Sequence, residues 1–259
     1  MKSWALITGA SEGIGRELAK LFAADQHNLV LVARSENRLK ELASELQTQH
    51  GIEVRILAKD LTTPNAAAEI FEAVSPLPVS VLVNNAGSGW HGNFATTPLP
   101  QSLTIMRLNM EAVVTLTHLF LQPMLARRDG KILTVASTAA FQPGPSVNVY
   151  YATKAFAHSF SYALGEELRG SGVTVTTLCP GTTHTEFFKR GNFSPVRNLF
   201  TMDAATVARA GYRGMQRGRR TVIPGAANKI AAAISRRLPL SWSTAIVRRL
   251  HRNAGKRTA

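Results

Sequence analysis

Tyr150 and Lys154 stand four residues apart, a spacing that places a phenol and an ammonium on one face of a helix. The ordinary pKa of a phenol is about 10, and a nearby ammonium favours the phenolate and so lowers that pKa. Lowering it by about 2–3 units requires roughly 3–4 kcal/mol and brings proton transfer closer to neutral pH. Ser137 precedes Tyr150 by 13 residues and directly follows a predicted strand at 131–136. We therefore expect a ligand site where this helix meets the end of that strand.

A glycine-rich turn lies near the start of the chain, between an apolar run at 4–8 and a stretch of helical spacing at 12–24. Gly9 permits a tight turn, Gly13 lets the backbone approach a pyrophosphate, and Gly15 lets the helix pack closely on the strand. The N-terminus of the helix would face the anion with free N–H groups. The turn therefore predicts a dinucleotide cofactor, contacted also by Ser11, Glu12 and Ile14.

The residues after the second apolar run, 29–33, indicate which dinucleotide binds. A site for NAD usually has an acidic residue at this strand end, which binds the ribose 2′-hydroxyl. Here Ala33 is followed by Arg34, whose guanidinium can bind a phosphate but cannot accept a hydrogen bond. Arg38 lies one helical turn further along. These residues predict NADP(H). Glu12 is an argument against it, because its negative charge would lie close to the expected 2′-phosphate.

Apolar runs alternate with helical stretches along most of the chain, which predicts a parallel sheet covered by helices. We predict an α/β fold with one Rossmann-type, doubly wound parallel sheet and helices on both of its faces. This domain covers residues 1–225, and a basic amphipathic extension covers 226–259. The predicted strands are 4–8, 29–33, 54–57, 79–83, 131–136, 173–178 and 221–223, and the main helices are 12–24, a helix capped by Ser35, 101–127, 149–169 and 203–216.

Over about residues 4–223, these motifs together resemble those of the short-chain dehydrogenase/reductase family. The resemblance rests on Thr8-Gly9 to Gly15, Asp60-Leu61, Asn84-Asn85-Ala86-Gly87, Asn109, Ser137, Tyr150, Lys154 and Pro180-Gly181, in that order. It implies hydride transfer that depends on a nicotinamide cofactor, and it implies a homodimer or homotetramer.

The resemblance also implies a role for each motif. Tyr150 would be the general acid when a carbonyl is reduced and the base in the reverse direction, and Ser137 would polarise the substrate oxygen. Lys154 would lower the pKa of Tyr150 and hold the nicotinamide ribose, and Asn109 would hold a water for proton supply. Tyr151 has no lysine four residues later and is interpreted as packing. The other expected cofactor contacts are Asp60, Leu61, Asn85, Ala86, Gly87, Pro180, Gly181, Thr183 and Thr185.

A long segment between Pro180 and Asp203 is rich in aromatic residues. In the family this region closes over the substrate, so its aromatic side chains favour a bulky, apolar carbonyl or alcohol as substrate. The alternative is a lid whose aromatic side chains face the core. The residues concerned are Phe187, Phe188, Phe193, Leu199, Phe200 and Met202, with Trp90 and Phe141 on neighbouring loops. The expected substrate contacts are Ser137, Phe141, Phe187 and Phe188.

The net charge of +14 is concentrated at the C-terminal end of the chain. Residues 1–203 hold 17 Lys/Arg against 16 Asp/Glu, whereas residues 204–259 hold 13 Lys/Arg and no acid. Apolar stripes that include Trp242 accompany the basic residues after 225, a combination typical of helices that lie on anionic membranes. The alternatives are an acidic partner or packing of the extension on the body. No nucleic-acid recognition motif is present, so we expect no nucleic-acid partner.

One cysteine in 259 residues fits a reducing compartment, and no signal peptide or transmembrane run is visible in the sequence. We therefore expect a cytoplasmic protein, peripheral to a membrane if the extension binds lipid. The seven histidines form no ligand-spaced pair, so no metal site is expected. The first hypothesis is an NADP(H)-dependent carbonyl reductase or alcohol dehydrogenase acting on a small molecule. The second is a non-catalytic NADP-binding regulator or scaffold recruited through its basic extension.

Overall fold

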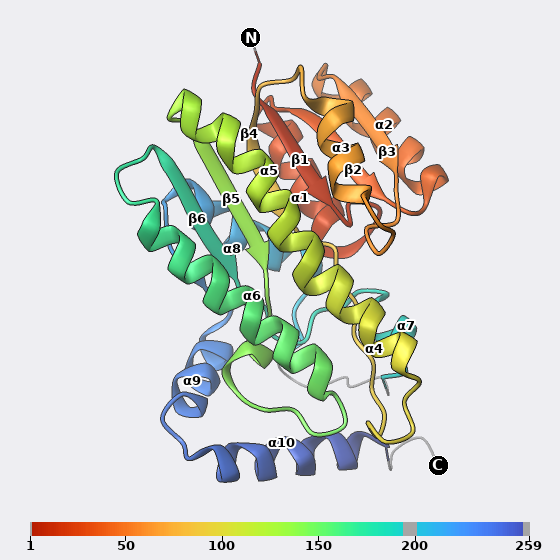
Figure 1. The fold of residues 1–259 in the computed structure, drawn as a ribbon, viewed down its shortest axis with the longest axis vertical. Coiled ribbons are helices and arrows are strands. Elements are labelled where there is room, and N and C mark those ends of the chain that lie inside the picture. The colour runs from red at the N-terminus through yellow and green to blue at the C-terminus, as the bar shows by residue number, and fades with distance from the viewer. Residues whose placement is uncertain (1, 194–200, 256–259) are drawn as a thin grey trace.

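The computed structural model describes residues 2–193 and 201–255, and its centre is a parallel sheet (Figure 1). The order of the strands across the sheet is β3-β2-β1-β4-β5-β6-β7, which reverses direction after β1 and confirms the predicted doubly wound topology. The strands are β1 (Trp4–Thr8), β2 (Asn28–Ala33), β3 (Val54–Ala58), β4 (Val79–Asn84), β5 (Gly130–Val135), β6 (Val173–Leu178) and β7 (Thr221–Val222).

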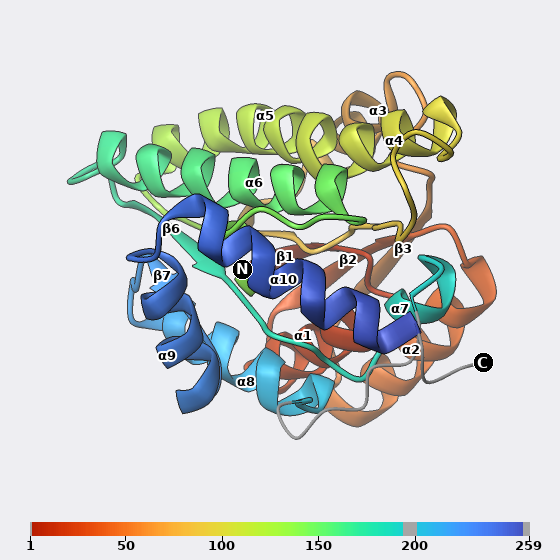
Figure 2. The ribbon, with the colours of Figure 1, turned by 90° about the horizontal axis from the view of Figure 1, so that it is seen from below.

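Helices cover both faces of the sheet (Figure 2). Successive residues of a strand point to opposite faces, so Ala5 and Ile7 of β1 pack in one apolar core and Trp4 and Leu6 pack in the other. The first core is closed by α1 (Gly13–Ala24), α2 (Glu36–His50) and α8 (Ala204–Gln216), and the second by α3 (Ala66–Val74), α5 (Ala112–Arg127) and α6 (Asn148–Glu167).

The helix predicted over 101–127 is interrupted in the structure. It consists of α4 (Leu99–Met106), one turn of π-helix, η1 (Arg107–Glu111), and α5. A π-turn inserts an extra residue and so changes which side chains face inward, and such turns are frequent at functional sites. The consequence here is that Asn109 is buried.

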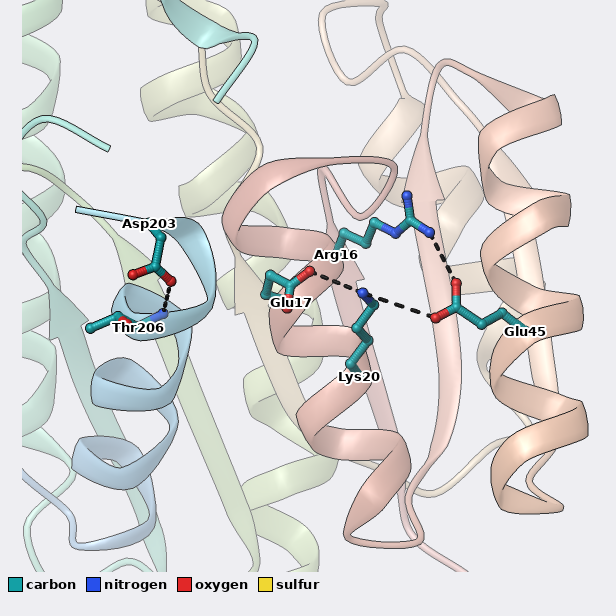
Figure 3. Close-up of polar contacts among 6 residues, drawn as sticks. All are labelled: Arg16, Glu17, Lys20, Glu45, Asp203 and Thr206. Atoms are coloured by element: carbon teal, nitrogen blue, oxygen red, sulfur yellow. Dashed lines mark hydrogen bonds and ion pairs between the residues drawn. The ribbon is translucent and has the colours of Figure 1, made fainter. Parts of the chain in front are cut away.

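Polar contacts fix the ends and outer faces of the helices. Ser35 stands at the N-cap of α2 without a capping side-chain bond, contrary to the sequence prediction. Asp203 does cap α8, accepting a hydrogen bond of 2.7 Å from the backbone N–H of Thr206 (Figure 3). Between α1 and α2, Arg16 lies 2.9 Å from Glu45, with Lys20 bridging Glu45 and Glu17 (Figure 3). Exposed pairs of this kind contribute about 0–1 kcal/mol each.

The C-terminal extension forms two helices, α9 (Ala226–Ser235) and α10 (Leu240–Gly255). Both figures show α10 crossing the end of the sheet at which the parallel strands terminate, opposite the N-terminus (Figures 1 and 2). Short helices η2 (Thr138–Phe141) and α7 (Phe187–Arg190) also lie at this end. Within the described residues, none of the helices combines the length and apolar character required to span a bilayer.

Candidate active site

A single continuous cavity of about 1000 Å³ opens at the carboxyl ends of the strands. Its lining joins the glycine-rich turn to Arg34 at one extreme and to Ser137, Tyr150 and Lys154 at the other. Residues that are far apart in the chain therefore share one space, which is the position where open α/β sheets bind ligands.

The turn between β1 and α1 has the shape that its glycines predict. Gly9 and Gly13 both adopt positive φ, of 64° and 54°, where other residues are strained. A Cβ on Gly13 would lie 2.8 Å from Thr185 Cγ2, and one on Gly9 would lie 2.8 Å from Asn85 Nδ2. A Cβ on Gly15 would overlap the carbonyl oxygen of Gly9, so only glycine lets α1 begin this close to the strand. The backbone cradle thus fits a pyrophosphate at the N-terminus of α1.

The hydroxyl of Thr8 joins the ends of β1 and β4 beneath this cradle. It donates to the carbonyl of Val83 at 3.1 Å and accepts from the backbone N–H groups of Asn85 and Ala86 at 3.0 Å. The Asn85 side chain returns two bonds, to the carbonyls of Thr8 and Gly9. This network holds two walls of the cavity at a fixed separation.

Arginines and acids meet at the far end of the cavity, past the end of β2. Arg34 is largely exposed and lies 3.9 Å from the carboxylate of Asp60, which is itself held by the backbone N–H and hydroxyl of Thr62. Arg38 donates to Glu12 at 2.6 Å. The acidic residue of the glycine turn is therefore paired with one of the two arginines expected to bind a 2′-phosphate.

Glu12 also contacts α7, which lies in the segment after β6. Its carboxylate accepts a second bond, at 2.5 Å, from Arg190 at the end of α7. Two guanidiniums thus share one carboxylate that is mostly screened from solvent. The contact joins residues 178 positions apart and ties the glycine turn to the segment after β6.

Tyr150 and Ser137 lie together at the other end of the cavity. The Ser137 hydroxyl accepts from the backbone N–H of Ala139 at 3.1 Å, and its contact with the Pro180 carbonyl is long, at 3.4 Å. A hydrogen bond from Ser137 lowers the pKa of Tyr150, but burial has the larger effect and raises that pKa to about 12. The two hydroxyls therefore face one space, with the phenol in its protonated form.

Lys154 is buried on the next turn of α6 and donates to the Val135 carbonyl at 2.8 Å. Burial lowers the pKa of this lysine to about 8. Its Nζ lies 5.8 Å from the centre of the Tyr150 ring, in a cation–π position. Burial is the largest effect on both groups and opposes either charge, so the pKa of Tyr150 lies above its ordinary value. The lowering of this pKa by Lys154 stays a prediction.

Asn109 lies behind the cavity wall. Its Oδ1 accepts from the N–H of Ser88 at 3.0 Å, and its Nδ2 donates to the Ser88 carbonyl and to the Thr153 hydroxyl. Both amide hydrogens are used, and one lone pair of Oδ1 is left. A Cβ on Gly87 would lie 3.2 Å from Lys154 Nζ and 3.3 Å from Asn109 Oδ1, so the two polar groups approach each other across that glycine. The role of Asn109 in proton supply stays a prediction.

Comparison with known proteins agrees with this arrangement. Residues 3–193 match the family model described as short chain dehydrogenase. The chain belongs to the short-chain dehydrogenase family. A solved short-chain dehydrogenase from Sphingobium yanoikuyae, in complex with NADPH, superposes with a TM-score of 0.83 at 32% identity, over 91% of this chain and 93% of that one.

Two relatives by sequence act on large molecules, to judge from their names. A very-long-chain 3-oxoacyl-CoA reductase of Phaeosphaeria nodorum is 39% identical over 67% of this chain and 52% of its own length. A 17-beta-hydroxysteroid dehydrogenase type 3 of Mus musculus is 35% identical over 73% of this chain and 63% of its own length. The chain thus spans between half and two thirds of the length of these relatives.

Aromatic side chains form the roof of the cavity. The ring centres of Phe187 and Phe193 lie 5.4 Å and 6.5 Å from that of Tyr150, and Phe188 packs edge-on against Phe193. Gly89 makes room for them, because a Cβ there would lie 2.9 Å from both the Phe187 and Tyr150 rings. The roof next to the phenol is therefore apolar.

Two aromatic residues expected at the substrate lie elsewhere. Phe141 packs against His158 and under the guanidinium of Arg236, which lies 4.2 Å from its ring centre, so it is not a cavity residue. Trp90 lies beside Gly92 and Thr97, outside the main cavity. We correct both assignments; the expected lid residues Leu199 and Phe200 fall outside the described residues.

The structure brings most of the sequence-predicted residues into the cavity lining and adds several others. The predicted lining residues are Gly9, Ser11, Glu12, Gly13, Ile14, Arg34, Arg38, Asp60, Leu61, Asn85, Ala86, Gly87, Ser137, Tyr150, Lys154, Pro180, Gly181, Thr183, Thr185, Phe187 and Phe188. The added residues include Lys59, Gln142, Arg190 and Leu250 of α10. No local motif in the sequence marks these four, since each reaches the cavity through the tertiary fold.

Proposed function

We propose that this dehydrogenase uses NADP(H) to interconvert a bulky, apolar ketone or aldehyde and its alcohol. The observation that carries the proposal is one continuous cavity with Arg34 and Arg38 at one end and Ser137 and Tyr150 under an aromatic roof at the other. The absence of an acid at Ala33 favours a 2′-phosphate over a free 2′-hydroxyl.

When bound, the nicotinamide gives or takes the hydride. The chain's own residues supply the rest of the chemistry. Ser137 donates a hydrogen bond to the carbonyl oxygen and so orients and polarises it. Tyr150 donates its phenolic proton as negative charge develops on that oxygen, and a pKa of about 12 keeps the phenol protonated at neutral pH. Positioned acids of this kind contribute about 10²–10⁴-fold in rate.

Lys154 and Asn109 act from behind the phenol. The ammonium of Lys154 would stabilise the phenolate left after proton transfer, which its Nζ, 5.8 Å from the centre of the Tyr150 ring, supports. Its remaining N–H groups would hold a ribose hydroxyl of the bound cofactor. Asn109 fixes Ser88 and Thr153 and thereby the walls on either side of Lys154.

The roof and the relatives agree on the substrate class. Phe187, Phe188 and Phe193 offer apolar rings beside Tyr150 and would stabilise a hydrocarbon body by its removal from water. Both relatives are named for large substrates, a very-long-chain acyl thioester and a steroid. We therefore propose a ketone with a large hydrocarbon part.

The test is a spectrophotometric assay of NADPH and NADH oxidation with a panel of ketones of increasing apolar bulk. We expect turnover with NADPH, a preference for NADPH over NADH, and kcat/KM that rises with the size of the hydrocarbon part. Phe187→Ala should reduce the selectivity for bulk, whereas Phe141→Ala should leave it unchanged. Lack of turnover across the panel, or selectivity for small polar carbonyls, would contradict the proposal.

A further inference from the structure

The C-terminal helices carry the largest set of exposed apolar side chains on the described part of the chain. Six of the eleven exposed large hydrophobic residues lie on α9 and α10. Their exposed fractions run from 51% to 69%, although Val247 and Ser243 on the inner side of α10 are buried. We call these six the C-terminal surface: Ile230, Ile234, Leu240, Trp242, Ile246 and Leu250.

Charge on the same two helices has one sign. Lys229, Arg248 and Arg249 are exposed on these helices and Arg236 and Arg237 on the link between them, and no Asp or Glu occurs after Asp203. Apolar side chains interspersed with cations, on helices with one buried edge, match the chemistry of an interface between anionic headgroups and acyl chains.

The C-terminal surface lies close to the opening of the candidate active site. Helix α10 runs across the carboxyl end of the sheet (Figure 2), and Leu250 belongs both to the C-terminal surface and to the cavity lining. Leu250 is thus 65% exposed and yet lines the cavity that holds Tyr150. The aromatic roof of Phe187 and Phe193 lies in the same cavity.

We infer that the C-terminal surface docks on an anionic lipid bilayer and turns the mouth of the cavity toward it, so that an apolar substrate enters from the lipid. The second part rests on the proposed function, whereas docking does not. A second copy of the chain fits the surface less well, because a two-fold contact would bring the same arginines against each other with no acid to neutralise them.

Docking is tested with the full chain and vesicles of phosphatidylglycerol or of phosphatidylcholine alone. We expect flotation with the anionic vesicles at low salt, weakening as salt is raised, and little with the zwitterionic ones. Trp242 reports the contact directly, since Trp4 is buried and Trp90 half-buried. Its emission should move to shorter wavelength with anionic vesicles, and the change should vanish in Trp242→Phe.

Matched variants separate docking from folding. Arg248→Gln with Arg249→Gln should weaken vesicle binding about 25-fold, from about fivefold for each charge near an anionic surface. Trp242→Ser with Ile246→Ser should also weaken it. The control, Phe94→Ser with Leu99→Ser, removes exposed apolar side chains from a loop and α4 and should not. All three should keep the circular dichroism and the vesicle-free turnover of a water-soluble ketone.

Delivery is tested with a long-chain ketone dissolved in the vesicles. The arginine variant should raise KM for it and leave kcat unchanged. A wild-type chain that stays off anionic vesicles at low salt, or a control variant that binds as weakly as the others, would overturn the inference. So would tail variants that change the oligomeric state without lipid, which would make the surface an interface between copies. Absence of turnover with intact flotation would instead refute only the proposed activity.

Discussion

Replacing Lys154 by methionine should stabilise the fold while it disables the site. The side chain is 5% exposed, and burial lowers its pKa from 10.5 to about 8. At about 1.36 kcal/mol per pKa unit, holding the charged form in this place costs about 3 kcal/mol at pH 7. Methionine has a similar length and no charge, but it leaves the Val135 carbonyl without its 2.8 Å partner, a loss of about 1 kcal/mol. We therefore expect Lys154→Met to raise the free energy of unfolding by about 2 kcal/mol at pH 7.

The pH dependence gives the sign of this effect. Between pH 8 and 10.5 the unfolded chain still binds a proton at residue 154 and the folded chain has lost it, so the wild-type fold gains stability as pH rises through that window. Below pH 8 both states are protonated and the full cost is present. The stability difference between Lys154→Met and the wild type should therefore be largest at neutral pH and shrink toward pH 10.5. Tyr150, whose pKa is raised to about 12, stays protonated in both folded proteins up to pH 10.5 and so contributes little to the difference.

The measurement is urea unfolding of both proteins without cofactor at several pH values from 6 to 10.5. Lys40→Met, at an exposed lysine of α2 that pairs with Glu36, serves as the control and should change stability by less than about 1 kcal/mol with no such trend. A Lys154→Met protein that is less stable than wild type at pH 7, with a difference independent of pH, would refute the reasoning. It would show that the hydrogen bond to Val135 outweighs the buried charge.

Three further substitutions test the roles of named side chains. Tyr150→Phe should lower kcat by about 10²–10⁴-fold and leave the NADPH dissociation constant nearly unchanged. Tyr151→Phe should retain most of the activity, and the opposite pattern in a turnover assay would show that the wrong tyrosine has been assigned. Arg34→Ala should weaken NADPH binding by about 10- to 150-fold and NADH binding little, as measured by fluorescence titration, and full retention of the preference would remove Arg34 from the 2′-phosphate site. Glu12→Gln releases Arg38 and removes a negative charge from the expected 2′-phosphate site, so the same titration should show NADPH binding about twofold to fivefold tighter. An unchanged or weaker affinity would show that Glu12 does not compete with the phosphate for Arg38.

Local patterns were sufficient to predict the sheet and the glycine turn. The strand positions follow from runs that are apolar on both faces, and Gly9 and Gly13 have the positive φ that their spacing implies. The Tyr150–Lys154 pair also follows from helical spacing, which holds regardless of what surrounds the helix. These features depend on a few consecutive residues, which is why the sequence alone predicts them.

Features that depend on distant contacts were not predictable in the same way. The burial of Asn109 requires a π-turn that nothing in 101–127 signals, and the Glu12–Arg190 pair joins residues 178 apart. Phe141 is expected at the substrate because it is an aromatic residue on a loop beside the lid segment, but packing turns its ring toward His158 and Arg236. In each case the tertiary neighbours decide where the side chain points.

The raised pKa of Tyr150 and the lowered pKa of Lys154 have one cause and together bear on the direction of the reaction. Burial favours the neutral phenol and the neutral amine, so the protein groups by themselves keep the proton on Tyr150. A protonated phenol can give a proton to a reduced carbonyl oxygen, but it cannot accept one from an alcohol. Oxidation therefore requires the phenolate, which the positive charge of Lys154, present below its pKa of about 8, would stabilise. Burial of the phenol thus supports the acid role that carbonyl reduction needs, and the reverse role needs the charge of Lys154 to offset that burial.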